Sequence, residues 1–294
     1  VELLWERGTL FENEVISKLK LPFTDLSDLS PRDKESRTFD AIKNKELIYG
    51  GRIRSGNLLG EPDLLRYDNV TGYVAGDIKS GSGEEGDEDT GTEKPKKHYA
   101  VQLALYTDIL EGLGLSKGRS PFIWDIHGNE ITYNLDAPLG QRNSRTLWQF
   151  YKEKVGELRS IIAKPGLTLP ALGANCKQCH WHTHCKEHVK ELDDHTLIAE
   201  LGRAKRDILL PHIKTMHDLA SIDPQALPDI KGIGKATIVK FISRARLLVD
   251  PDACPYCTVI PSLPSAEVEL FFDIEVDPMR DVCYLHGFVE RRNN

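Results

Sequence analysis

The sequence predicts an α/β protein in which a sheet flanked by helices comes first, followed by a small all-helical domain and a short β-hairpin. Three observations lead to this fold class. Up to about residue 163, runs with a helical period alternate with short strand-like runs. Residues 191–250 carry helix-period runs, and residues 267–290 carry two strand-like runs across a turn. We therefore divide the chain into residues 1–190, 191–250 and 251–294.

Length and composition bound the class of protein. The chain has 294 residues, 40% of them hydrophobic, which is ample for packed cores. No apolar run is long enough to cross a bilayer and no signal-peptide layout opens the chain, so we expect a cytoplasmic, reducing location and no membrane partner. The net charge of -7 counts against nucleic acid as a default partner. Because the chain begins at Val1, we expect both ends to be cut from something longer.

The first predicted helix, residues 1–20, has one apolar stripe with Glu12 at its edge. A carboxylate that points partly toward a core is costly unless it meets a cation, so Glu12 is a candidate metal ligand. Glu14 takes that role if the helix has a different register. The alternative is a solvent-facing Glu12 beside an ordinary apolar stripe.

The central feature is a predicted hairpin over residues 61–79, reached through a polar segment with a short helix (21–44) and one or two strands (46–59). Side chains alternate along a strand, so Asp77 and Lys79 share one face, and Asp63 opens the partner strand. Two carboxylates and an ammonium on a rigid sheet would repel and desolvate one another unless a divalent cation and a phosphate used them. The alternative is an exposed, ion-paired hairpin.

The rest of the first domain follows this hairpin. Residues 81–97 are acidic and Gly-rich and predict a mobile loop, either a solvated insertion or an acidic mimic of nucleic acid that occupies the site. In the next helix, residues 98–113, Gln102 and Tyr106 are four apart and share a face. Strand-like runs at 122–124 and 131–133 and a helix over 144–163 complete the domain.

Three motifs together resemble the RecB-like group of the PD-(D/E)XK nucleases. They are a glycine followed four residues later by an acid (Gly8 to Glu12), a Pro-Asp pair followed on the next strand by acid-x-Lys, and Gln-x-x-x-Tyr in the helix after that strand. The resemblance implies a restriction-endonuclease-like mixed sheet flanked by helices. It implies a catalytic set of six residues: Glu12, Asp63, Asp77, Lys79, Gln102 and Tyr106.

The same resemblance implies the roles of these residues. Mg²⁺ or Mn²⁺ would be held by Glu12, Asp63, Asp77 and the carbonyl of Ile78. Lys79 would orient the attacking water or stabilise charge on the pentacovalent phosphate. Gln102 and Tyr106 would border the lysine and the nucleic-acid strand.

Six cysteines in a long chain without a secretory signal favour metal or cluster ligands over disulfides. Cys176, Cys179 and Cys185 have the spacing C-x2-C-x5-C, which can serve one metal centre. The iron-sulfur subgroup of RecB-like nucleases has three cysteines in this arrangement and a fourth near the start of the domain, so the resemblance favours a [4Fe-4S] cluster. No cysteine precedes Cys176. The alternatives are Zn²⁺ completed by a histidine, and free buried cysteines; the candidate histidines are His180, His182 and His184.

Two further motifs lie in the last hundred residues. Gly232-Ile233-Gly234 resembles a helix-hairpin-helix motif, which implies phosphate contacts from the backbone and from nearby lysines; the alternative is a plain turn. The nucleic-acid-binding set is Lys231, Gly232, Gly234 and Lys235, with Lys240 and Arg244 adding attraction.

Cys254 and Cys257 form a second, isolated C-x2-C pair. Asp273 and Glu275 share a strand face, as at the start of RNase H-like exonuclease domains; we expect a truncated, inert hairpin, or an ordinary edge hairpin.

The function that the resemblance implies is metal-dependent hydrolysis of DNA phosphodiester bonds, on single strands or ends, in DNA repair, recombination or defence. RNA is the second substrate class, and a helicase or repair protein is the expected partner. One alternative is a nucleic-acid-binding scaffold whose nuclease site is vestigial. Another is a zinc-stabilised adaptor. The sequence carries no signal for an oligomeric state.

Overall fold

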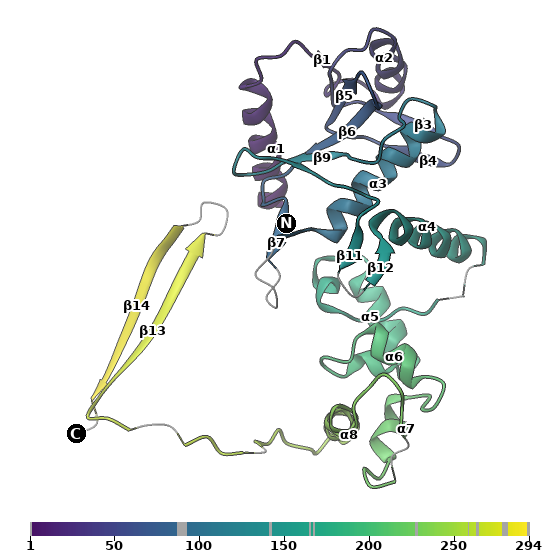
Figure 1. The fold of residues 1–294 in the computed structure, drawn as a ribbon. Helices are drawn as coiled ribbons and strands as arrows, with labels where there is room; N and C mark the ends of the chain where they lie inside the picture. Colours follow the sequence, from purple (N-terminus) through teal and green to yellow (C-terminus); the bar gives the residue numbers. More distant parts are fainter. Residues whose placement is uncertain are drawn as a thin grey trace. The chain divides into compact units, whose positions relative to one another are not determined.

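The computed structural model describes residues 2–86, 93–140, 143–164, 166, 168–226, 229–257, 259–262, 265–277 and 282–292. The chain divides into two compact units, Val1–Leu169 and Pro170–Asn294 (Figure 1). The predicted first domain ends at residue 190, whereas the first unit ends at Leu169. In the structure the segment with Cys176, Cys179 and Cys185 therefore belongs to the second unit.

A six-stranded mixed sheet forms the centre of the first unit, as the sequence predicts. The strand order is β1-β2-β5-β6-β9-β10. The pairs β1/β2 and β6/β9 are parallel, and the other neighbours are antiparallel. The strands are β1 (Thr24–Asp25), β2 (Ile48–Tyr49), β5 (Leu64–Asp68), β6 (Gly72–Ile78), β9 (Phe122–Trp124) and β10 (Glu130–Thr132).

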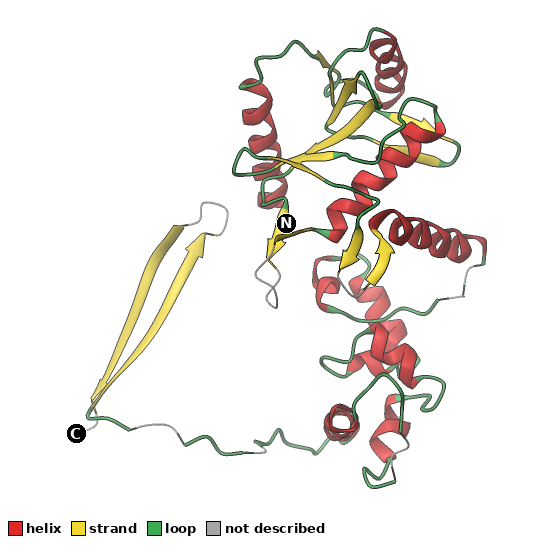
Figure 2. Cartoon of the chain, viewed as in Figure 1, coloured by secondary structure: helices red, strands yellow, loops and turns green. Residues whose placement is uncertain are grey.

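Helices flank this sheet, and the alternation of side chains along β6 explains the two cores between them. Tyr73 and Ala75 face the larger core, to which α2 (Pro31–Lys43), α3 (Lys97–Gly112) and α4 (Leu147–Ala163) contribute. Val74 and Ile78 face the smaller core, which α1 (Glu2–Ser17) covers through Ile16 and its neighbours. Figure 2 shows α1 and α3 on opposite sides of the strands.

Three two-stranded ribbons surround the sheet. They are β3–β4 (Ile53–Ser55 and Leu58–Gly60), β7–β8 (Glu84–Gly86 and Glu93–Pro95) and β11–β12 (Pro138–Gly140 and Asn143–Thr146). The ribbon β7–β8 differs from the loop that the sequence predicted over residues 81–97, because Glu85 pairs with Lys94. The rest of the predicted acidic loop, residues 87–92, lies outside the described residues.

The second unit begins with helices, and those from η2 onward pack around a separate hydrophobic core. The elements are η1 (Ala174–Gln178), α5 (His182–Glu191), η2 (His195–Leu197), α6 (Arg203–Leu209), α7 (Met216–Ser221) and α8 (Lys235–Val249). Leu209, Leu219, Ile238 and Phe241 are central members of its core. Within it a buried ion pair joins Arg206 to Asp194 at 2.7 Å. None of the helices in the described part of the chain is long and apolar enough to cross a membrane.

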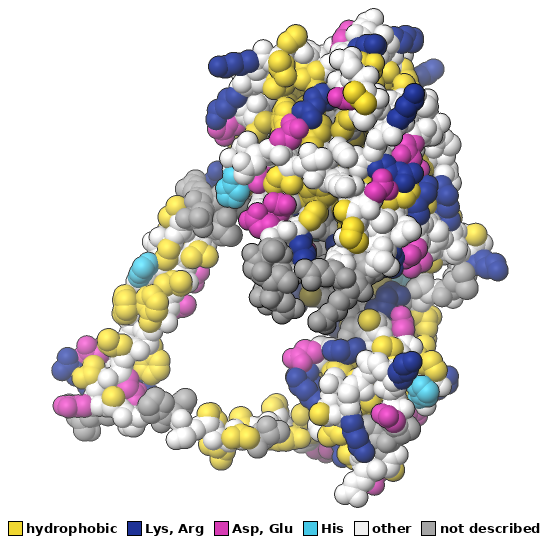
Figure 3. Space-filling model, viewed as in Figure 1, with side chains coloured by type: hydrophobic (Ala, Val, Ile, Leu, Met, Phe, Trp, Pro, Cys, Tyr) yellow, Lys and Arg dark blue, Asp and Glu magenta, His cyan; other side chains and the backbone are white. Residues whose placement is uncertain are grey.

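The last two strands, β13 (Val268–Asp277) and β14 (Val282–Arg292), form an antiparallel hairpin. The register sets Asp273 opposite Gly287 and Glu275 opposite Leu285. Large apolar side chains on both faces are exposed, among them Phe271 and Phe272 at 51% and 56%, and Figure 3 shows hydrophobic side chains along this hairpin. Asp273 and Glu275 therefore lie on a solvated ribbon, and the inertness of this hairpin stays a prediction.

Candidate active site

The junction of β5 and β6 holds the two predicted aspartates. Leu64 pairs with Gly76, so Asp63, just before β5, stands opposite Asp77 near the end of β6. The Ile78 N–H donates a hydrogen bond to Asp63 Oδ2 at 2.7 Å, and the Asp63 N–H reaches Asp77 Oδ1 at 3.4 Å. The two carboxylates are thereby fixed to the backbone of a paired sheet rather than to a loop.

Lys79 completes this group. Its ammonium lies 2.6 Å from Asp77 Oδ2, and Asp77 is only 1% exposed. That oxygen is buried, and in the described structure no donor reaches it with hydrogen-bond geometry. Its contact with the Lys79 ammonium is therefore an ion pair whose angles do not meet those of a hydrogen bond. Burial lowers the pKa of the Lys79 ammonium, but its interactions with Asp77, together with those with Asp63 and Tyr99, outweigh burial and leave that pKa raised.

The site carries more negative charge than its cations balance. Burial, followed by the charges of Asp77 and Glu12, raises the pKa of Asp63 to about 8, although the Ile78 N–H and Lys79 act in the opposite direction. Asp63 therefore holds its proton to a higher pH than an ordinary aspartate does. A strongly raised carboxyl pKa in a buried group of acids is typical of functional sites.

Glu12 reaches the same region from α1. It is half-buried, and the Tyr49 hydroxyl donates a hydrogen bond to Glu12 Oε1 at 2.8 Å. Glu14 is exposed and pairs with Lys18 one turn along the helix. The helical register therefore directs Glu12, and not the fallback Glu14, toward the sheet.

Gln102 and Tyr106 lie together on α3, as their spacing predicts. The Gln102 Nε2 amide donates to the Tyr106 hydroxyl at 2.8 Å, and that hydroxyl donates to the Glu61 carbonyl oxygen at 3.3 Å. Burial and the charges of Asp77 and Asp63 raise the pKa of the Tyr106 phenol. The pair thus contacts the chain two residues before Asp63.

Two neighbours of the site were not identified from the sequence. Tyr49 lies in β2, within the predicted strand region 46–59, but its partner Glu12 is 37 residues away in sequence, so no local pattern marks the contact. Gly60 allows the Tyr106 ring to approach: a Cβ at this position would lie 2.6 Å from Tyr106 Cδ1. In the sequence, the glycine at this position, two residues before Pro62, was the feature that could have indicated such a close approach.

The donor chemistry of the site suits a hard divalent cation, since it consists of carboxylates and a nearby backbone carbonyl. The buried Asp77 Oδ2 lies 2.6 Å from the Lys79 ammonium, so a cation bound there would share this oxygen with Lys79. In the described ranges, however, no three His, Cys, Asp or Glu side chains stand close enough together to form a metal-binding group. Each of the three acids instead has a partner of its own: the Tyr49 hydroxyl for Glu12, the Ile78 N–H for Asp63 and the Lys79 ammonium for Asp77.

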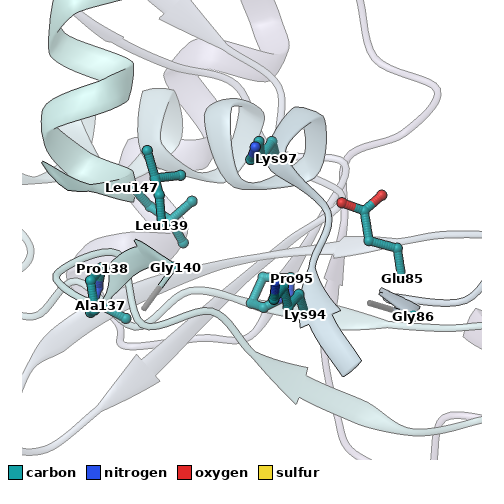
Figure 4. A pocket seen from close by; sticks show the side chains of 10 residues that line it. All are labelled: Glu85, Gly86, Lys94, Pro95, Lys97, Ala137, Pro138, Leu139, Gly140 and Leu147. Carbon is teal, nitrogen blue, oxygen red and sulfur yellow. The ribbon is translucent and has the colours of Figure 1, made fainter. Parts of the chain in front are cut away.

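A groove of about 660 Å³ lies beside α3 and α4, and Gln102 forms part of its lining. Its other lining residues include Leu105, Leu158 and the cations Lys154 and Arg159. A second pocket, of about 380 Å³, lies between the β7–β8 ribbon and the start of α4 (Figure 4). Its lining, which includes Pro95, contains none of the predicted site residues.

The cysteine segment forms a compact turn. Cys176 and Cys185 are half-buried and Cys179 is exposed, and none of the six cysteines forms a disulfide. The Cys179 N–H donates to the Cys176 carbonyl at 3.1 Å, and the Gly173 N–H lies 3.3 Å from Cys176 Sγ. A shared metal centre for the three thiols stays a prediction.

The Gly232-Ile233-Gly234 turn lies directly before α8. Gly232 has a φ of +101°, and Gly234 is the N-cap of the helix. The nearby Lys231 and Lys235 are exposed. Lys240 and Arg244 add less positive charge to this surface than the sequence predicts, because both form ion pairs with Glu200. The long-range partner, forty residues away in sequence for Lys240, could not be read from the local pattern.

Comparison with known proteins found no matching family model, no matching curated protein and no matching solved structure.

Proposed function

We propose that this chain is a metal-dependent nuclease of the RecB-like PD-(D/E)XK type, with a restriction-endonuclease-like fold, which hydrolyses DNA phosphodiester bonds. The observation that carries the proposal is the fixed group of Asp63, Asp77 and Lys79 at the β5–β6 junction. An excess of buried acid beside one ammonium is unfavourable in a merely structural hairpin and useful for a cation and a phosphate.

Glu12, Asp63, Asp77 and the Ile78 carbonyl would hold Mg²⁺ or Mn²⁺, which supplies a hydroxide nucleophile and charge neutralisation at the phosphate. The three carboxylates would draw together on binding, and Asp63 would release its proton. Lys79, 2.6 Å from Asp77 Oδ2, would orient the water or stabilise charge on the pentacovalent phosphate.

The remaining parts of the proposal concern nucleic-acid contacts and the cysteines. Gln102 and Tyr106 would contact the strand, and the turn at 231–235 would bind phosphates as a helix-hairpin-helix segment. Cys176, Cys179 and Cys185 would hold a [4Fe-4S] cluster, with Zn²⁺ as the alternative, in a reducing compartment. Single strands or free ends of DNA are the proposed substrates, in repair, recombination or defence alongside a helicase or repair protein.

The decisive experiment compares cleavage of end-labelled DNA by the wild type, Lys79→Ala and Lys43→Ala in Mn²⁺ and in EDTA. Lys43 is the matched control because its ammonium pairs with the exposed Asp40 on α2. We expect Mn²⁺-dependent cleavage by the wild type and the control, and a loss of about 100-fold or more in Lys79→Ala. Single-stranded, duplex and RNA substrates run in parallel identify the substrate class.

The second candidate is a nucleic-acid-binding scaffold with a vestigial site. It is favoured by the lack of an assembled three-acid group among the described residues. DNA binding of equal strength by the wild type and Lys79→Ala, with cleavage by neither, would favour this candidate over the nuclease.

A further inference from the structure

We infer that Tyr49 is a positioning residue that holds the Glu12 carboxylate at the acid group of β5 and β6. The inference rests on the proposed function, because it concerns how one of the proposed cation ligands is kept in place. It assigns a role to a side chain outside the six predicted catalytic residues.

The contact between the two side chains is direct. Tyr49 is 5% exposed, and its hydroxyl donates to Glu12 Oε1 at 2.8 Å. The phenol ring is held by packing, with the Phe23 ring at 6.3 Å in an edge-to-face arrangement. A fixed donor of this kind selects one orientation of a long, otherwise flexible carboxylate.

The charge environment of Glu12 makes this contact more important. Within the part of the chain that the structure describes, Glu12 has no ion-pair partner, whereas Asp77 has Lys79. Its carboxylate also lies near Asp63, and its negative charge is one of the causes that raise the pKa of that carboxyl. Without the Tyr49 hydroxyl, repulsion would favour rotamers of Glu12 that turn away from the aspartates.

The next residue along the chain holds a second acid. The Gly50 N–H donates to the Asp63 carbonyl oxygen at 2.9 Å. Gly50 has a φ of +64°, and a Cβ there would lie 2.9 Å from Ser27 Cα, so this close backbone approach requires glycine. The dipeptide Tyr49-Gly50 thus ties the Glu12 side chain on α1 and the backbone of Asp63, just before β5, to the same end of β2.

This arrangement fits a general feature of metal sites, in which ligating carboxylates accept hydrogen bonds from outer residues that set their orientation. Loss of such a partner weakens metal affinity or activity by about 10–100-fold. Because the phenol donates to one oxygen only, the second oxygen of Glu12 is left for the cation.

The test measures Mn²⁺ binding directly, without DNA, by electron paramagnetic resonance of the free ion, and then the Mn²⁺ dependence of cleavage. The variants are Tyr49→Phe and Tyr73→Phe. Tyr73 is the matched control: it is buried in the same sheet, and its hydroxyl donates to the Glu46 carbonyl at 2.9 Å. Asp77→Asn reports whether the bound Mn²⁺ belongs to the site.

We expect Tyr49→Phe to bind Mn²⁺ about tenfold more weakly and to recover nearly wild-type cleavage at saturating Mn²⁺, with Tyr73→Phe unchanged in both. Unchanged Mn²⁺ affinity in Tyr49→Phe, with a loss in Asp77→Asn, overturns the role of Tyr49 and leaves the nuclease proposal intact. Equal losses in Tyr49→Phe and Tyr73→Phe indicate a general structural effect and also overturn it. If the wild type binds no Mn²⁺, both proposals are wrong.

Discussion

The raised pKa of Asp63 predicts that Asp63→Asn stabilises the protein in the absence of divalent cations. Folding shifts the pKa of this carboxyl from 3.8 to about 8. The folded protein therefore holds the proton in a range where the unfolded chain has released it. Ionisation favours the unfolded state, and this penalty grows between pH 3.8 and about pH 8 and is constant at higher pH.

The size of the effect follows from the same shift. One pKa unit corresponds to ~1.4 kcal/mol, so even half of the elevation amounts to about 3 kcal/mol. An asparagine keeps an oxygen that can accept the Ile78 N–H and removes the charge. We expect the melting temperature in EDTA at about pH 9 to rise by ~6–12 °C in Asp63→Asn, and this gain to shrink as the pH falls through the range given above.

Thermal unfolding followed by tryptophan fluorescence suits this measurement, because three of the four tryptophans (Trp5, Trp124 and Trp148) lie in the first unit and the fourth, Trp181, is already 61% exposed in the folded second unit. Asp40→Asn is the matched control: Asp40 pairs with Lys43 on the surface of α2, and its loss should change stability by about 0.5 kcal/mol or less. Two outcomes would refute the raised pKa of Asp63: a melting temperature of Asp63→Asn at or below the wild-type value at high pH, or a gain that does not vary with pH.

Two further substitutions test the packing of each unit. Gly60→Ala places a Cβ against the Tyr106 ring and should lower the free energy of unfolding by about 1–3 kcal/mol in urea titrations, whereas Gly8→Ala, which meets no atom within 4 Å, should not destabilise. Asp194→Ala leaves the 2%-exposed Arg206 without its buried partner and should cost about 3–5 kcal/mol in the second unit. Asp207→Ala removes the exposed partner of the same arginine and should cost about 1 kcal/mol or less; equal costs would contradict the ranking by burial.

The part of the site that the sequence predicted depends on short-range regularities. Alternation along β6 sets Asp77 and Lys79 on one face, and the four-residue spacing joins Gln102 to Tyr106. The mixed sheet with flanking helices was likewise predictable, because β5, β6 and α3 are long enough to show their periods.

The parts that were missed depend on contacts between distant segments. The two-residue strand β1 lies in the segment predicted as polar with a short helix, because two residues show no alternation. The strand β2 falls within the predicted strand region 46–59, but the role of Tyr49 appears only from its contact with Glu12 on α1. The pairing of Lys240 and Arg244 with Glu200 likewise arises from tertiary structure. A charge that appears free in a sequence is often neutralised by a residue that packing brings close.

The hairpin of β13 and β14 has a practical consequence for handling the protein. A two-stranded ribbon with apolar side chains exposed on both faces is marginal in water and offers unpaired edges to other chains. Self-association of the purified chain should therefore originate in these strands, while a version ending after α8 keeps the hydrophobic cores of both units. Light scattering on the two versions would show the shorter one monodisperse at concentrations where the longer one clusters.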